Sequence, residues 1–276
     1  MHAAVRRVAL TAAAAVLALA VLPGGAGASS LPLMAAKVDP NQLPEPFGIS
    51  VTVYGQDQPY AIEKLGVNIP GVTFDDVKRL NIQNHLAEQD AQLDVYVLPF
   101  LNLFGFVGSL TGQTAVNMSA LDIPAALGAP AGFRFDNLHI SYHGTVYGVG
   151  ATLAGGNDRY FGSLTGIWTR EDLSGDFDSS ARALVISPKL GMHTRGGSFW
   201  IGAMYQHAQE DHKGTIDLNV GLPQAIPVGF SVKLQQRNDW NGLVGMQARV
   251  ARQLDFAIEG GFGDRRSVSA ALTYRF

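Results

Sequence analysis

Four charged residues near the end of the chain are spaced so that they would share one face of a small sheet: Arg249, Asp255, Glu259 and Arg275. If the intervening turns centre near positions 252 and 265, Arg249 lies opposite Asp255, and Asp255 lies opposite Arg275. Opposite residues on antiparallel strands are close enough to form ion pairs. Glu259 would follow one or two rungs further along. The pattern predicts a charge cluster that acts as an ion-selective or gating constriction or, more simply, as a salt-bridged filling of a narrow interior.

A second group that could do chemistry is His139, Ser141 and His143, which alternate along one stretch. At spacings of two they share one face of a strand. A histidine beside a serine can activate the hydroxyl for acyl transfer, and histidines also bind metals. Because Leu138, Ile140 and Tyr142 occupy the opposite face, we expect the group to point inward as ordinary polar lining. We therefore predict no metal site and no cofactor.

The elements that must position these residues are strands. In the last eleven residues, apolar and small or polar side chains alternate without a slip, which is the period of a strand with two unlike faces. Nine further stretches carry strand patterns, near residues 47–54, 92–98, 102–111, 138–154, 159–170, 184–193, 199–205, 240–250 and 254–262. A bulge near His143 and Gly144 would keep one apolar face continuous along the fourth.

The connections between these ten strands alternate in length. Those after the second, fourth, sixth and eighth are short, whereas three of the others are long, at residues 56–90, 112–137 and 209–239. We expect polar loops there, with a short helix near 75–88 as an option. Short turns on one side and long loops on the other are typical of a transmembrane antiparallel up-and-down β-barrel. Twelve strands, with an extra hairpin near 230–237, or eight strands are the alternatives.

An export signal opens the chain. Arg6 and Arg7 precede an apolar run at residues 8–22, and residues 26–28 read Ala-Gly-Ala, a typical cleavage site. We expect a signal peptide at 1–28, a flexible periplasmic lead at 29–45 and the barrel at 46–276. Removing 1–28 takes away two arginines and no acid, so the net charge of −3 becomes −5, which does not favour a nucleic-acid partner. The chain has no cysteine.

Only helices and closed barrels satisfy their backbone hydrogen bonds in lipid, and no apolar stretch after the signal has the pattern of a membrane helix. The apolar faces should therefore point to lipid and the charged faces inward, because Lys or Arg at mid-bilayer costs roughly 2–4 kcal/mol. A secreted β-sandwich or lipocalin-like barrel, the soluble alternative, would show the reverse.

The final Tyr274-Arg275-Phe276 resembles the C-terminal strand of Gram-negative outer-membrane barrels, whose last Phe and the aromatic two residues before it are read by the barrel assembly machinery. Residues 93–102, 147–156 and 260–276 are similar to a family of uncharacterised Gram-negative outer-membrane barrel proteins. The resemblance implies an outer-membrane location, with lipid and the assembly machinery as partners. It implies no substrate and no catalytic residues.

Three function classes follow. The first is a non-enzymatic, porin-like barrel that passes or binds a small solute, and we favour it. The second is a structural or surface-recognition barrel acting through its long loops. The third is a lipid hydrolase, because His139 and Ser141 resemble the pair in outer-membrane phospholipases and lipid A deacylases. Those enzymes carry Asn after the Ser and present the pair outward, whereas here Tyr142 follows Ser141.

Overall fold

The computed structural model describes residues 31–34, 43–67, 81–117, 138–175, 178–218 and 226–276. The predicted signal peptide and most of the predicted lead lie outside these residues. Eleven strands and no helix make up the described part. They are β1 (Phe47–Val67), β2 (Asn81–Leu98), β3 (Leu101–Asn117), β4 (Leu138–Gly156), β5 (Tyr160–Gly175), β6 (Asp178–Thr194), β7 (Gly197–Leu218), β8 (Ile226–Gln236), β9 (Trp240–Ala251), β10 (Leu254–Phe262) and β11 (Arg266–Arg275).

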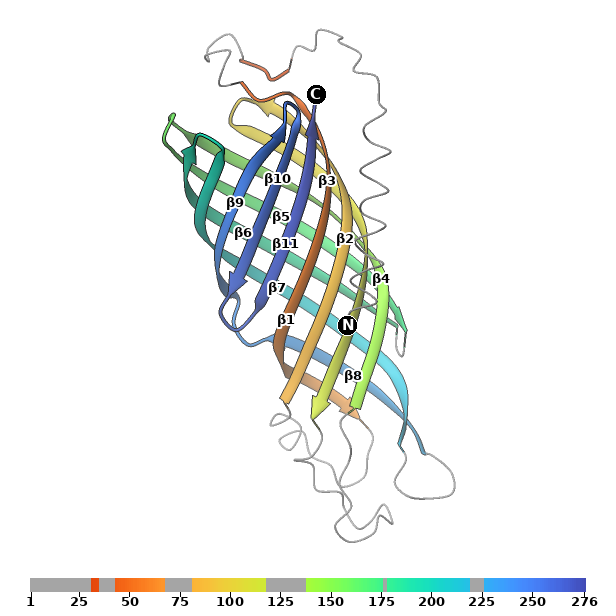
Figure 1. Cartoon of the computed structure of the whole chain (residues 1–276). Helices are drawn as coiled ribbons and strands as arrows, with labels where there is room; N and C mark the ends of the chain where they lie inside the picture. The colour runs from red at the N-terminus through yellow and green to blue at the C-terminus, as the bar shows by residue number, and fades with distance from the viewer. Residues whose placement is uncertain (1–30, 35–42, 68–80, 118–137, 176–177, 219–225) are drawn as a thin grey trace.

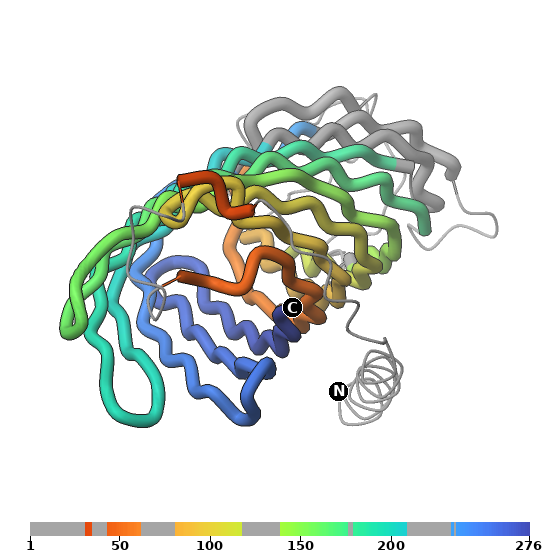
Figure 2. The backbone as a smooth tube through the Cα atoms, turned by 90° about the horizontal axis from the view of Figure 1, so that it is seen from above, coloured from red at the N-terminus to blue at the C-terminus, as the bar shows by residue number. Residues whose placement is uncertain are grey.

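The strands form one closed antiparallel barrel (Figure 1). Its last strand returns to its first, and the backbone amides of Phe47 and Phe276 each donate to the carbonyl of the other, at 3.1 and 3.0 Å. Figure 2 shows the C-terminus beside the start of β1 when the chain is seen from above. Because every strand has two neighbours, the described part of the barrel leaves no long unpaired edge.

Strands β8 and β9 are two halves of one interrupted strand. Both run antiparallel to β7: β9 pairs with its first half and β8 with its second, and the break falls at residues 237–239. The described barrel therefore has ten strands at the end where β1 begins and β11 ends, the terminal end, which confirms the predicted count. The twelve-strand alternative, with its extra hairpin near 230–237, is wrong, since residues 226–236 form a single strand.

The β10–β11 hairpin reaches only part of the way along the barrel. Its strands have 9 and 10 residues, whereas β1 and β7 have 21 and 22. Beyond its tip, β8 pairs directly with β1, so the wall narrows to eight strands at the other end, the extended end. A membrane strand needs about 9–11 residues, so the short hairpin has the height of one bilayer core and the other strands exceed it.

Much of what the sequence analysis assigned to loops is strand. Residues 57–67, 81–90, 112–117 and 209–218 continue β1, β2, β3 and β7 toward the extended end. The optional helix at 75–88 is wrong over residues 81–88, which pair with β1 and β3, and 75–80 lie outside the described residues. All four turns at the terminal end, between β2 and β3, β4 and β5, β6 and β7, and β9 and β10, are short, as predicted.

The outer surface divides at the level of the hairpin tip. Toward the terminal end it carries an apolar belt, a band of exposed large apolar side chains from β2 to β7 and from β9 to β11, among them Leu93, Val107, Val149, Leu190, Ile201, Val244 and Val268. Toward the extended end the same faces become polar: on β2, Leu93 and Ala91 give way to His85, Gln83 and Asn81. The soluble alternative, with an apolar interior and a polar exterior, is wrong for this surface.

Aromatic side chains lie at both borders of the apolar belt. At the terminal end Phe276 stacks between Phe47 and Tyr274, with ring centroids 5.9 Å from each. At the other border Trp240 packs against Tyr205 at 5.3 Å, and Trp168 precedes the outward Arg170. Rings at both borders are the pattern of membrane–water interfaces.

Candidate functional site

A cavity of about 300 Å³ lies inside the barrel at the level of the apolar belt. Inward-facing side chains of β1 to β7, β10 and β11 line it. One part of the wall is apolar and formed by Phe104, Phe106, Ile167, Val185 and Met204. Inward Gly148 and Gly150 make room for these rings, because a Cβ there would lie 2.6 and 2.3 Å from the ring atoms of Phe106 and Phe104. The cavity is large enough for a small organic molecule.

The other part of the cavity wall is charged. Four carboxylates, those of Glu88, Asp90, Glu171 and Glu259, face one lysine, Lys189. The ammonium of Lys189 binds Glu259 at 2.5 Å, and the indole N–H of Trp200 donates to the same carboxylate oxygen at 2.6 Å. Glu259 is thereby fixed, and the three other acids of the lining have no second lysine or arginine among the lining residues. A cation that enters favours the ionised form of these carboxyl groups and is bound by them, whereas an anion is not.

A buried polar cluster fills the lumen at the terminal end. The side chain of Asp94, 1% exposed, accepts from Asn102 at 2.6 Å and from the guanidinium of Arg275 at 3.0 Å. The guanidinium also lies 5.0 Å from the ring of Tyr96. The Cβ of an alanine at Gly48 would fall 2.2 Å from Asp94, so only glycine fits there. This cluster narrows the lumen between the cavity and the terminal end.

The four residues of the predicted charge cluster are divided among three separate ion pairs. Arg249 and Asp255 are cross-strand neighbours, 3.4 Å apart, but Arg249 is 72% exposed. Asp255 lies opposite Thr273, so its expected pairing with Arg275 is wrong. The reason is that the β10–β11 turn is centred on Asp264 and not on Arg265. Moving the centre of a turn by one residue changes the partner of each strand residue by two positions. Glu259 lies two inward positions beyond Asp255 but pairs with Lys189.

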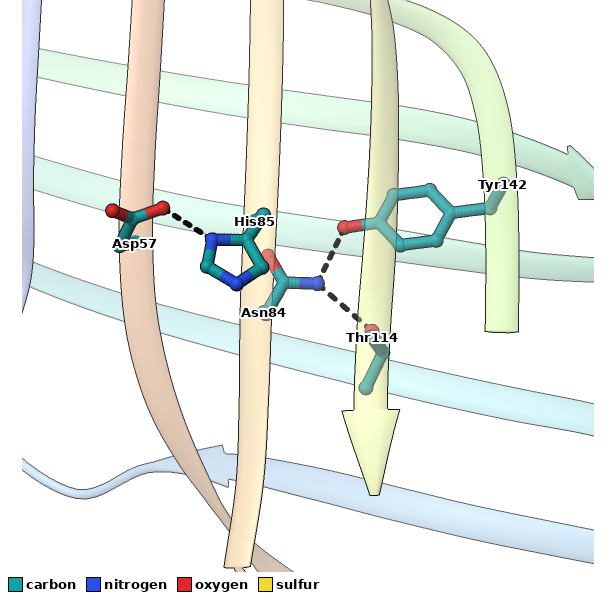
Figure 3. A network of polar contacts seen from close by, with 5 residues as sticks. All are labelled: Asp57, Asn84, His85, Thr114 and Tyr142. Carbon is teal, nitrogen blue, oxygen red and sulfur yellow. Dashed lines mark hydrogen bonds and ion pairs between the residues drawn. The ribbon is translucent and has the colours of Figure 1, made fainter. Parts of the chain in front are cut away.

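Toward the extended end the cavity is closed by packed side chains. Leu110, Tyr142, Val146 and Leu173 form a buried apolar cluster across β3, β4 and β5. Beside it the amide of Asn84 donates to the hydroxyl of Tyr142 at 2.6 Å and to that of Thr114 at 2.9 Å (Figure 3). These strands bring together residues that are far apart in the sequence, and the lumen is filled where the barrel narrows to eight strands.

His139, Ser141 and His143 face outward, which corrects the expected inward orientation. β4 pairs with β3 without a register shift, so the bulge expected at His143 and Gly144 is absent. Tyr142 therefore points into the lumen, and all three polar residues are exposed on the outer wall beyond the apolar belt. The outward direction matches the lipid hydrolases that the pair resembles, while Tyr142 after Ser141 still differs. No group of residues in the described ranges is arranged to hold a metal ion.

Sequence reasoning missed Asp94, Asn102, Lys189 and Trp200. Each lies on an inward face that the alternation already marked as polar or mixed, so their direction could have been found. The partner of Lys189 and Trp200 could not, because Glu259 on β10 meets them across the lumen and not across a strand pair. Contacts through the interior depend on barrel diameter and shear, which no local pattern encodes.

No protein-family model matches the chain, and no curated protein is significantly similar to it. Several solved structures resemble it. The outer membrane protease OmpT from Escherichia coli has a TM-score of 0.47 at 7% identity, over 84% of this chain and 97% of that one. The transport unit of the autotransporter AIDA-I from Escherichia coli has a TM-score of 0.41 at 11% identity, over 87% of this chain and 92% of that one. The beta domain of the Bordetella autotransporter BrkA has a TM-score of 0.42 at 11% identity, over 84% of this chain and all of that one.

The structures that this chain resembles are thus Gram-negative outer-membrane barrels. At TM-scores below 0.5 and such low identities, the likeness carries no information on what the chain binds or does.

Proposed function

We propose that this chain is an integral outer-membrane barrel without enzymatic activity that binds a small cationic solute in its lumen and passes it across the membrane. Support for the membrane comes from the outer surface. Leu190 and Ile201 are 69% and 68% exposed, next to each other on β6 and β7, and such residues continue around the terminal end. A continuous exposed apolar surface of this kind marks contact with lipid.

The observation that carries the solute proposal is the cavity of about 300 Å³ with four carboxylates, one lysine and an apolar wall. A protonated amine would bind the acids, while an attached apolar group would pack on Phe104, Phe106 and Met204. Packed side chains narrow the lumen beyond the cavity, around Asp94 toward one end and around Leu110 toward the other. The proposal is therefore a binding site with gated passage and not a permanently open pore.

Binding of phenylethylamine to the detergent-solubilised protein, measured by isothermal titration calorimetry, tests this proposal. We expect it to bind, and 3-phenylpropanoate, which has a similar shape and the opposite charge, to bind at least about tenfold more weakly. Glu88→Gln should weaken phenylethylamine binding about tenfold or more, since a charged hydrogen bond contributes roughly 1.5–3 kcal/mol.

The matched control is Asp255→Asn, which removes a carboxylate outside the cavity and should leave binding unchanged. Equal binding of the amine and the acid, or no effect of Glu88→Gln, would show that the cavity does not select cations. A surface-recognition barrel, the alternative that acts through its connections, predicts no binding in the lumen at all.

The lipid-hydrolase alternative keeps one observation in its favour, the outward direction of His139 and Ser141. Under our proposal the purified protein releases no fatty acid from mixed micelles of phospholipid and detergent. If it does release fatty acid, and both His139→Ala and Ser141→Ala abolish the release while leaving the heat-modifiable gel mobility intact, then the barrel is an enzyme.

A further inference from the structure

The tip of the β10–β11 hairpin marks a junction in the barrel wall. Up to Asp57, β1 pairs with β11, and from Tyr60 onward it pairs with β8. Gln58 and Pro59, between them, have a neighbour only on the β2 side. Proline has no N–H to leave unpaired, so it suits this gap. Arg265, the last residue of the hairpin turn, lies at this junction and is only 2% exposed.

The guanidinium of Arg265 is largely without partners. Its Nη1 donates to the side-chain oxygen of Gln206 at 2.6 Å, whereas Nε and Nη2 are buried and make no hydrogen bond. No ion pair of Arg265 is found among the described residues. A buried guanidinium without a carboxylate is unusual, because charged groups are buried only when they are paired.

Three buried amide side chains at the same junction also have unused hydrogen-bonding atoms. Gln58 lies next to Asp57, the residue that pairs with Arg266 at the hairpin tip. The side-chain oxygen of Gln58 has no hydrogen-bond partner. The side-chain amides of Gln236 and Asn241 are also buried, and both the nitrogen and the oxygen of each lack a hydrogen-bond partner. The Asn241 side chain lies against the hairpin turn, since its oxygen would be 2.6 Å from a Cβ at Gly263. Such groups are normally satisfied, so several together indicate a missing polar partner.

This junction adjoins the cavity. Gln206, which accepts from Arg265, lines it, and so does Tyr54, which lies within electrostatic reach of Arg265. The two free nitrogens, Nε and Nη2, form the edge of a guanidinium that binds a carboxylate through two parallel hydrogen bonds. The acids of the cavity and the arginine behind its wall are thus complementary to the two charges of one molecule.

We propose that the solute is a small zwitterion, such as an amino acid with an apolar side chain, and that Arg265 binds its carboxylate. The inference rests on the proposed function of the cavity and adds the second charged group. The carboxylate reaches Nε and Nη2 when the side chain of Gln206 turns aside, and the Gln236 and Asn241 amides supply further donors. The ammonium group meets the acids at Glu88 and Asp90.

The test compares three probes of one shape by isothermal titration calorimetry: phenylalanine, phenylethylamine and 3-phenylpropanoate. We expect the wild type to bind phenylalanine at least tenfold more tightly than phenylethylamine. In Arg265→Gln, the affinity for phenylalanine should fall to the affinity for phenylethylamine. The affinity for phenylethylamine itself should not change from that of the wild type. Arg265→Lys keeps the positive charge but cannot donate two parallel hydrogen bonds to a carboxylate. Its affinity for phenylalanine should lie between those of the wild type and Arg265→Gln. Heat-modifiable gel mobility checks that each variant is folded.

A second measurement needs no variant. Acetate, added as a competitor, should weaken the binding of phenylalanine to the wild type and leave that of phenylethylamine unchanged. If phenylethylamine binds but phenylalanine binds no more tightly, the zwitterion inference is wrong and the cation-binding function stands. If Arg265→Gln weakens both probes equally, Arg265 only supports the wall, and the inference is again wrong. If no probe binds, both proposals fail.

Discussion

Val149→Arg is expected to prevent stable insertion of the barrel. Val149 is 59% exposed in the apolar belt on β4, so an arginine there would face hydrocarbon. The expected loss is about 2–4 kcal/mol of folding free energy, the cost of a cation near the bilayer midplane. Urea titration of the protein folded into phospholipid vesicles, followed by heat-modifiable gel mobility, measures this loss.

The matched control is Thr111→Arg. Thr111 also faces outward, on the neighbouring β3, but lies beyond the apolar belt opposite the exposed His143. We expect this variant to fold within about 0.5 kcal/mol of the wild type, as surface substitutions usually do. If the two arginines destabilise equally, the division of the outer surface into a lipid-facing belt and a water-facing extension is wrong.

Asp94→Ala is expected to destabilise the terminal end of the lumen by about 3–5 kcal/mol, the usual effect of removing one partner from a buried ion pair. Asp94 is enclosed, and its removal leaves Arg275 without its carboxylate and Asn102 without an acceptor. The same urea titration measures the loss. Because the terminal cluster also narrows the lumen, Asp94→Ala should raise the conductance of the protein in planar bilayers.

Asp255→Ala tests whether burial causes the effect. Its partner Arg249 is largely exposed, so the pair should contribute no more than about 1 kcal/mol. Conductance should also stay at the wild-type level, since this pair does not close the lumen. A loss as large as that of Asp94→Ala would mean that the two carboxylates have equivalent roles.

The fold could be predicted from the sequence because a strand with one face toward lipid must alternate apolar and polar side chains, and this pattern is local in the sequence. Alternation at residues 266–276, repeated in nine other stretches, sets which face is apolar, and the alternating connection lengths set the strand order. The rule fails where the strands leave the apolar belt. Residues 81–86 alternate Asn, Gln and His with Ile, Asn and Leu, which does not look like a membrane strand although the segment pairs with β1 and β3.

The site could be predicted less well. The Arg249–Asp255 pairing follows from a tight turn, whereas the Arg275 pairing failed because the turn centre at Asp264 lies one residue from the expected one. Lys189, Trp200 and Asp94 meet their partners across the lumen or at the closure of β1 on β11. Arg265 could not have been found, since the hairpin tip that buries it depends on where β8 joins β1.

The most direct test of the membrane assignment uses the three tryptophans of the chain. Trp168 and Trp240 are exposed on the outer surface, whereas Trp200 points into the lumen and binds Glu259. In single-tryptophan variants reconstituted into vesicles of brominated phospholipid, Trp168 and Trp240 should lose most of their fluorescence and Trp200 should keep it. Strong quenching of Trp200 with little quenching of Trp168 and Trp240 would contradict a barrel whose outer face meets lipid.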